Sequence, residues 1–274
     1  MGKYIKIKLW SFMSGIIVIF LVLYINVYIF SKGVHGLNYN FLFSKPLGFP
    51  LGTEGGIFPA IIGSIYFTGI ACCFASTIAI STALYLNFYC KNKYIHGIIS
   101  IVIQSIAGIP SIVLGLFGYT FLVVYLKLGI SLLSGGIILG IMIFPFIEVR
   151  IQKALEEIDK DIIYASYALG ISKSYTFFKL ILPMCFSEMI SIVALAGGFA
   201  MGATAPIMFT GGVVNAPVPN SILSPAMALP YHLYILIGEG ISVENAYKTA
   251  SVLLLFLLIL NSISIFTELF RKVK

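Results

Sequence analysis

The chain approaches one catalytic motif, a phosphate-binding loop, without completing it. Gly170-Ile171-Ser172-Lys173-Ser174 supplies the lysine and the hydroxyl that such a loop uses to bind nucleotide phosphates. It lacks the glycine directly before Lys173, and Tyr167 stands where the first glycine is required. No HExxH, GxSxG or dinucleotide fingerprint occurs. We therefore expect no ATP hydrolysis and no bound cofactor on this chain.

Side chains that bind metals or relay protons are scattered. The four cysteines form no Cys-x-x-Cys pair, and the three histidines fall in separate loops, so no metal site is expected. Glu188 is the only charged residue inside a predicted span. A carboxylate relay would need a second acidic residue, so we interpret Glu188 as facing the interface or a neighbouring helix.

One segment has the composition of a surface that contacts another protein. Ala165-Ser166-Tyr167-Ala168-Leu169-Gly170 is rich in small residues, and Leu182-Pro183 follows after eleven residues. Small side chains let another protein approach closely, and glycine tolerates a positive φ at a helix end. The sequence therefore predicts a short helix that ends at Gly170, and a second stretch that returns to an apolar run at Pro183.

The composition decides which elements can hold these residues. The chain has 274 residues, of which 59% are hydrophobic and 10% charged, and its mean hydropathy is +1.04. Soluble domains carry about 25% charged residues. These values exclude a soluble enzyme, a disordered chain and a secreted disulfide domain. The strands of an outer-membrane barrel alternate between apolar and polar residues with a period of two. This sequence shows no such alternation, which excludes a barrel. The sequence predicts an all-α polytopic membrane protein.

Six apolar runs are long enough to cross a bilayer, which needs about 20 residues. Thirteen of the 17 Lys and Arg residues fall on one side if the first segment starts inside. This bias places both termini in the cytoplasm. The same bias accounts for the net charge of +7, so binding to nucleic acid is not needed to explain it. The predicted spans are Leu9–Phe30, Ile57–Leu86, Gly97–Leu126, Leu128–Ile147, Pro183–Phe209 and Thr249–Phe266.

Three further segments complete the predicted layout. Leu9–Phe30 exceeds the length of a signal-peptide core, so we interpret it as a retained helix. Glu148–Leu182 is charged and is predicted to be a helical cytoplasmic loop. Thr210–Asn245 is rich in Pro and Gly and is predicted to be irregular or re-entrant.

The docking segment resembles the EAA loop of ABC importer permeases, with its EAA…G…LP pattern. Further stretches resemble, more narrowly, the permeases of phosphate ABC importers, the PstA class, and their order matches that class. The resemblance runs from about Glu54 to the C-terminus, so residues 54–274 are expected to form a type I permease core after an N-terminal helix and external loop (residues 1–53). The stretches are Gly55–Ile61, Ala107–Gly118, Thr204–Thr210 and Ala228–Tyr234.

The resemblance implies a transporter subunit without its own active site. Asp161–Gly170 would be a coupling helix that docks on a separate ATPase dimer, which binds ATP and Mg²⁺. The chain itself would lie in the cytoplasmic (inner) membrane. Its other partners would be a homologous second permease and an extracytoplasmic phosphate-binding protein. The residues implied in coupling are Tyr164, Ala165, Ser166, Ala168, Leu169 and Gly170.

Three positions depart from the family pattern. Tyr164 stands at the position of the family's loop glutamate, and Phe199 and Ala203 stand where the family usually has Arg and Glu. Either the partner permease supplies those charges, or polar groups suffice, or the cargo is another oxyanion such as molybdate or tungstate. A stand-alone secondary transporter is the other alternative. The polar candidates for the translocation path are Gln104, Ser105, Ser111 and Thr204.

Overall fold

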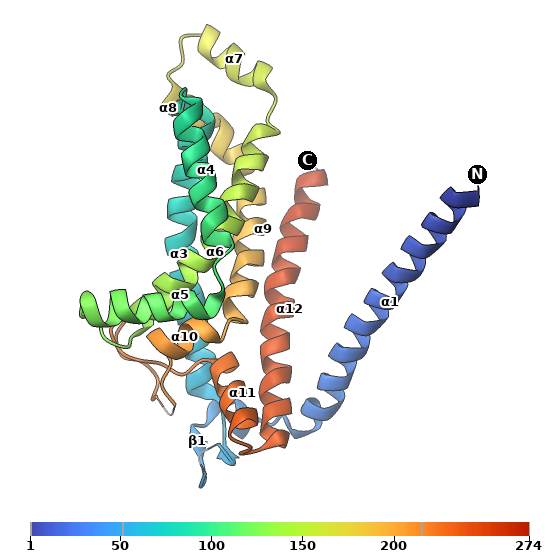
Figure 1. The fold of residues 1–274 in the computed structure, drawn as a ribbon, viewed down its shortest axis with the longest axis vertical. Coiled ribbons are helices and arrows are strands. Elements are labelled where there is room, and N and C mark those ends of the chain that lie inside the picture. The colour runs from blue at the N-terminus through green and yellow to red at the C-terminus, as the bar shows by residue number, and fades with distance from the viewer. Residues whose placement is uncertain (1, 51, 215, 274) are drawn as a thin grey trace.

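A computed structural model describes residues 2–50, 52–214 and 216–273 as a bundle of long helices (Figure 1). Among these residues, five helices are long and apolar enough to cross a membrane, and a bent pair makes a sixth. The elements are α1 (Gly2–Gly33), η1 (Val34–Gly36), α2 (Tyr39–Phe43), β1 (Pro46–Leu47), β2 (Glu54–Gly55), α3 (Phe58–Leu84), η2 (Tyr85–Tyr89), α4 (Lys93–Ala107), α5 (Ser111–Gly118), η3 (Tyr119–Tyr125), α6 (Leu132–Glu156), α7 (Lys160–Ala168), α8 (Lys173–Thr176), η4 (Phe177–Ile181), α9 (Leu182–Met201), α10 (Ala205–Thr210), α11 (Leu229–Gly238) and α12 (Val243–Val273).

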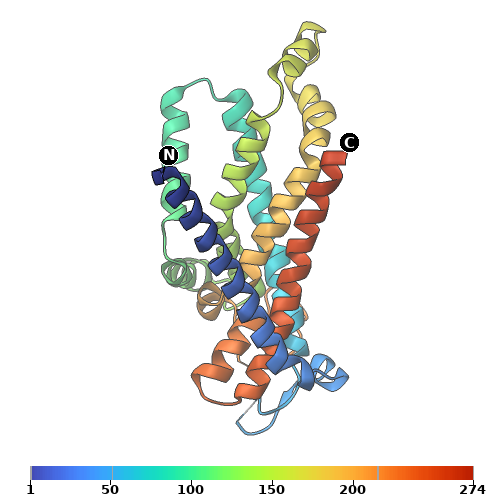
Figure 2. The ribbon, with the colours of Figure 1, turned by 90° about the vertical axis from the view of Figure 1, so that its right-hand side faces the viewer.

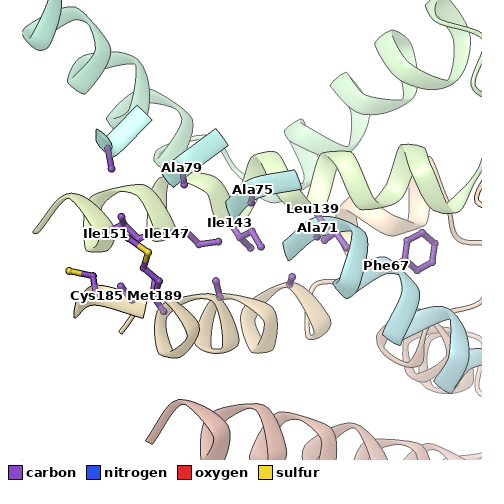
Figure 3. Packing of buried hydrophobic residues seen from close by; sticks show 14 of the residues in the cluster. Phe67, Ala71, Ala75, Ala79, Leu139, Ile143, Ile147, Ile151, Cys185 and Met189 are labelled. Carbon is purple, nitrogen blue, oxygen red and sulfur yellow. The ribbon is translucent and has the colours of Figure 1, made fainter. Parts of the chain in front are cut away.

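The core is built from α3, α6 and α9, and its residues recur every fourth position. A helix turns once in 3.6 residues, so side chains four apart lie on one face. Alanines on α3 let α6 approach closely, and the branched side chains of α6 fill the space (Figure 3). The buried rows are Phe67, Ala71, Ala75, Ala79 and Ala83 on α3, and Leu139, Ile143, Ile147, Ile151 and Leu155 on α6.

Helix α1 leans away from the bundle. None of its most apolar stretch is buried inside the chain, and both views show it separating from α12 towards its N-terminus (Figures 1 and 2). Its last turns hold it, where the Ser251 hydroxyl donates to the Ile29 carbonyl oxygen at 3.3 Å. Both chain ends point towards the end of the bundle that carries α7 (Figures 1 and 2).

Two predicted spans are broken, which corrects their expected outlines. Gly97–Leu126 is not one helix: α4 and α5 meet at 99°, because Pro110 disfavours a helical residue before it and starts α5 instead. Pro183–Phe209 stops at Met201, and α10 follows after Gly202. The predicted kink at Gly108 and Pro110 is in fact a change of direction.

Helix α6 starts and ends later than the predicted Leu128–Ile147. Ser131 caps its first turn, and the helix continues to Glu156. Glu148, assigned from sequence to the following loop, lies inside this helix and is fully buried, with no hydrogen-bond partner among the described residues. Glu188 is therefore not the only charged residue within a span. An apolar run ends at its first charge, whereas a helix ends where its packing and hydrogen bonds end.

The opposite end of the bundle is closed by short elements. β1 and β2 form a two-stranded antiparallel sheet that pairs Pro46 with Gly55. The predicted irregular segment Thr210–Asn245 contains turns, a bridge between Gly212 and Ala226, and the helix α11. Its backbone is held to α3, where the Ser64 hydroxyl oxygen accepts from the Leu229 amide at 2.8 Å.

Candidate functional site

The first candidate site is the loop around α7, defined here as residues 157–172. Asp159 caps α7 by accepting from the Asp161 amide at 2.9 Å. The helix ends before Gly170, whose φ of +76° is the left-handed conformation that was predicted for this glycine. Figure 1 shows α7 standing beyond the ends of the other helices. The helix is thus presented for contact with another molecule.

The two faces of α7 differ. Tyr164, Ala165, Ala168 and Leu169 face solvent, and the Leu169 side chain is 79% exposed. Ser166, one of the six residues implied in coupling, lies on the other face and is buried. Its hydroxyl donates to the Ile163 carbonyl oxygen at 2.8 Å and lies 3.0 Å from the Thr176 hydroxyl. Ser166 therefore holds α7 against α8 and does not lie on the exposed face of α7.

A continuous helical segment follows α7 after the turn 169–172. Ser172 caps α8 by accepting from the Tyr175 amide at 3.3 Å, and α8 runs without interruption through η4 into α9. Pro183 occupies the first turn of α9, where its missing N–H costs nothing. The α8–η4–α9 segment therefore reaches from the turn after α7 to Met201.

Helix α9 is in turn fastened to α12. The Ser191 hydroxyl donates to the Ser264 carbonyl oxygen at 3.0 Å, and the two serine hydroxyls lie 2.7 Å apart. The Ser187 hydroxyl donates to the Thr267 carbonyl oxygen at 2.6 Å. Hydrogen bonds between membrane helices hold them with about 0.6–2 kcal/mol each. Hydrogen bonds at two levels therefore hold α9 against α12.

The second candidate site lies where α4 and α9 break. Gly115 of α5 sits against α10, because a side chain there would lie 3.0 Å from the Ala205 carbonyl oxygen and 3.1 Å from Pro206. Gly118 packs in the same way between Ile138 and Thr210. These two glycines were given no role from the sequence. Residues three apart lie on one side of a helix, so this pair of glycines in an apolar helix was the available signal for a close contact.

The four polar path candidates lie near these breaks. Gln104 and Ser105 belong to the last turns of α4, Ser111 begins α5, and Thr204 precedes α10. Gln104, Ser105 and Ser111 are exposed, and Thr204 is half-buried. Gln104, Ser105 and Ser111 thus lie on the outer surface of the described part of the chain, and their role in a translocation path stays a prediction.

Phe199 lies in the last turn of α9, and Ala203 follows in the non-helical break between α9 and α10. The Phe199 side chain is 62% exposed, and Ala203 is half-buried against the main core. The i, i+4 rule for residues within one helix therefore does not relate these two positions. Phe199 places an apolar ring on an open surface.

Comparisons with known proteins agree with this arrangement. Residues 75–273 match the family described as binding-protein-dependent transport system inner membrane component. The chain is 30% identical over 212 residues to the phosphate transport system permease protein PstA 2 of Mycobacterium tuberculosis, covering 76% of this chain and 70% of that protein. It is 28% identical over 264 residues to the probable phosphate transport system permease protein PstA of Methanocaldococcus jannaschii, covering 93% and 91%.

A solved structure shares the fold. A chain of the MetNI methionine ABC transporter, in an inward-facing conformation, superposes with a TM-score of 0.64 at 18% identity. The superposition covers 78% of this chain and 94% of that one. At this identity the likeness shows the architecture alone.

Proposed function

The chain belongs to the family of binding-protein-dependent transport system inner membrane components, and from this premise we propose that it is the permease subunit of an ATP-driven importer of inorganic phosphate. The identification of phosphate as the cargo rests on the similarity to phosphate permeases over most of the chain, including the stretches that hold α5 and α10. The protein is a multi-pass membrane protein and a transport subunit. Hydrolysis of ATP belongs to a partner.

The positions of the candidate sites support the partners. The exposed face of α7 offers an apolar surface of Tyr164 and Leu169 to a cytoplasmic ATPase subunit. The surface position of Gln104, Ser105 and Ser111 supports a second permease that completes the path. We infer that an extracytoplasmic binding protein delivers phosphate at the opposite end, near α11. With α7 in the cytoplasm, both termini lie there too.

The same geometry supports a coupling mechanism. Closure of the ATPase dimer displaces α7, and the unbroken α8–η4–α9 segment carries that displacement to the break before α10. The break changes its position relative to α5, which packs on α10. ATP and the loaded binding protein each stabilise one arrangement, so together they drive alternation between open states.

Uptake of labelled phosphate tests the proposal. With the cognate partners expressed in cells that lack high-affinity phosphate uptake, we expect ATP-dependent uptake that arsenate inhibits and molybdate does not. Arsenate shares the charge and protonation of phosphate, so it competes for the same groups. An assembled, ATP-hydrolysing complex that carries molybdate or tungstate and no phosphate would instead support the other oxyanion, which the replacement of Arg by Phe199 and of Glu by Ala203 favours.

A double substitution tests whether the path passes α9. We expect Phe199→Arg with Ala203→Glu to insert normally and to retain uptake, because position 199 is exposed and position 203, in the break that follows α9, is only half-buried and adds a carboxylate near the new cation. Phe199→Arg alone is the matched control and is expected to be worse tolerated, since it lacks the neighbouring carboxylate. Membrane fractionation and phosphate uptake are the measurements. Failure of the double variant to insert would show that α9 faces lipid at this point.

A further inference from the structure

A cavity of about 560 Å³ lies between α7 and the ends of the long helices. It shares Tyr164 with the exposed face of α7, and none of its lining residues belongs to the breaks near α5 and α10. Four segments enclose it: the end of α3 with η2, the end of α6, α7 itself, and α8. The lining residues are Asn87, Phe88, Leu155, Glu156, Ile158, Lys160, Ile163, Tyr164, Tyr167 and Lys173.

The polar groups of this cavity are mostly hydrogen-bond donors. Two ammonium groups, from Lys160 and Lys173, line it together with the phenol groups of Tyr164 and Tyr167. Among the described residues, no acceptor binds Lys160 or either phenol. An ammonium has three donors and no acceptor. Lys160 and both phenol groups therefore retain donors that an incoming anion could bind.

Lys173 is held in place. Its ammonium donates to the Phe88 carbonyl oxygen at 3.4 Å and lies 5.7 Å from the centre of the Tyr89 ring. These contacts leave further N–H groups for another acceptor. Burial, with a smaller contribution from Tyr89, raises the pKa of Tyr167, so its hydroxyl remains protonated and can donate at neutral pH.

One carboxylate opposes this positive charge. Glu156 lines the cavity, and its Oε1 accepts from the Gln152 amide at 3.1 Å. The lining thus carries two ammonium groups against one carboxylate. An anion with several acceptor oxygens satisfies such a set better than water, because bonds between charged donors and anionic oxygens are short and strong.

We propose that this cavity is a cytoplasmic binding site for a tetrahedral phosphate-type anion, and that the bound anion slows transport. The anion joins Lys160 of α7 to Lys173 of α8, beside the end of α3, and so opposes the displacement of α7. Accumulated cargo would then restrain its own import. The choice of inorganic phosphate as the effector rests on the proposed function, whereas the anion site does not.

Equilibrium dialysis of labelled orthophosphate tests the site. The sample is the whole complex without binding protein, in phosphatidylcholine nanodiscs, with the ATPase sites filled by a non-hydrolysable ATP analogue. We expect Lys160→Met with Lys173→Met to weaken one class of phosphate sites by about tenfold or more, since charge-assisted bonds are lost. Methionine keeps an apolar stem of similar length. Lys153→Met, at an exposed lysine outside the cavity, is the control and should bind normally.

Two comparisons distinguish a lipid headgroup from free phosphate as the ligand, and test the anion site independently of the cargo. If phosphatidylglycerol in the nanodiscs displaces the phosphate, a lipid headgroup is the ligand and regulation by free phosphate is wrong. Equal binding by the double variant and the control would overturn the site itself. This readout does not depend on uptake, so it remains decisive even if the cargo is not phosphate.

The regulatory part is tested in proteoliposomes preloaded on the ATPase side. Phosphate in that compartment should slow initial uptake by the unsubstituted complex and have little effect on the double variant, while uptake without preloaded phosphate stays equal. Equal inhibition of both would overturn the regulatory role. Lys173→Arg with Lys160→Arg should restore the response, because both charges return.

Discussion

Replacement of Ala165 by arginine is expected to reduce ATP-driven phosphate uptake to background while the chain still inserts into the membrane. Ala165 lies on the exposed face of α7, beside Leu169, where an ATPase subunit would pack. A long cation there separates the surfaces and leaves a buried charge at their contact, which costs several kcal/mol. Gly170→Asp should act similarly, since the left-handed backbone and the small size at position 170 are both lost.

The measurements are phosphate uptake and co-purification of the ATPase subunit. Tyr94→Arg is the matched control, because Tyr94 is also exposed, at the start of α4, and lies outside the α7 loop. Normal co-purification and normal uptake in both α7 variants would show that α7 does not contact the ATPase subunit. Loss of function in Tyr94→Arg as well would indicate a general effect of added charge.

Replacement of Gly63 by leucine is expected to unfold the end of the bundle opposite α7. A side chain at Gly63 would overlap the Met227 carbonyl oxygen. That oxygen and its carbonyl carbon belong to the backbone, so they cannot rotate aside as a side chain could. The next residue, Ser64, binds the Leu229 amide, so α3 and the segment before α11 separate together. Overpacking costs about 1–3 kcal/mol where side chains can adjust, and more where the backbone must move.

Thermal unfolding in detergent measures this effect. Gly69→Leu is the control on the same helix, because nothing lies within 4 Å of the side chain that it would add. We expect a large fall in midpoint and yield for Gly63→Leu and little change for Gly69→Leu. Equal midpoints would mean that the segment before α11 does not stay packed on α3.

The sequence predicted the elements of this fold better than their ends. Apolar length identified the spans, and Gly170 marked the end of α7, because both follow from local chemistry. The direction change at Pro110 and the burial of Glu148 were not predicted. Both depend on tertiary packing. α5 turns to pack on α10, and Glu148 lies on α6, which continues past the apolar run because residues beyond it, such as Ile151, are buried in the core.

The candidate site was predicted in part for the same reason. The small residues of α7 predicted a short helix before Gly170, which the structure has, while its docking role stays a prediction. Only the contact between Ser166 and Thr176 shows which face of α7 is turned inward. The glycines of α5 needed α10 beside them before their role was visible. The cavity beneath α7 collects residues from four segments, and no local pattern brings Asn87, Glu156, Lys160 and Lys173 together.

The matched rows of α3 and α6 have a consequence for movement. Ala71, Ala75 and Ala79 face Leu139, Ile143 and Ile147 in order, so the interface repeats itself every four residues (Figure 3). Sliding one helix by a single repeat, about 6 Å at 1.5 Å per residue, would pair similar side chains within these rows. It would also move the Phe67 ring away from Gly135 and the Phe74 ring away from Gly140, where no side chain could be added without a clash. These glycine–aromatic contacts therefore fix a single register, so α3 and α6 are expected to move as a rigid pair.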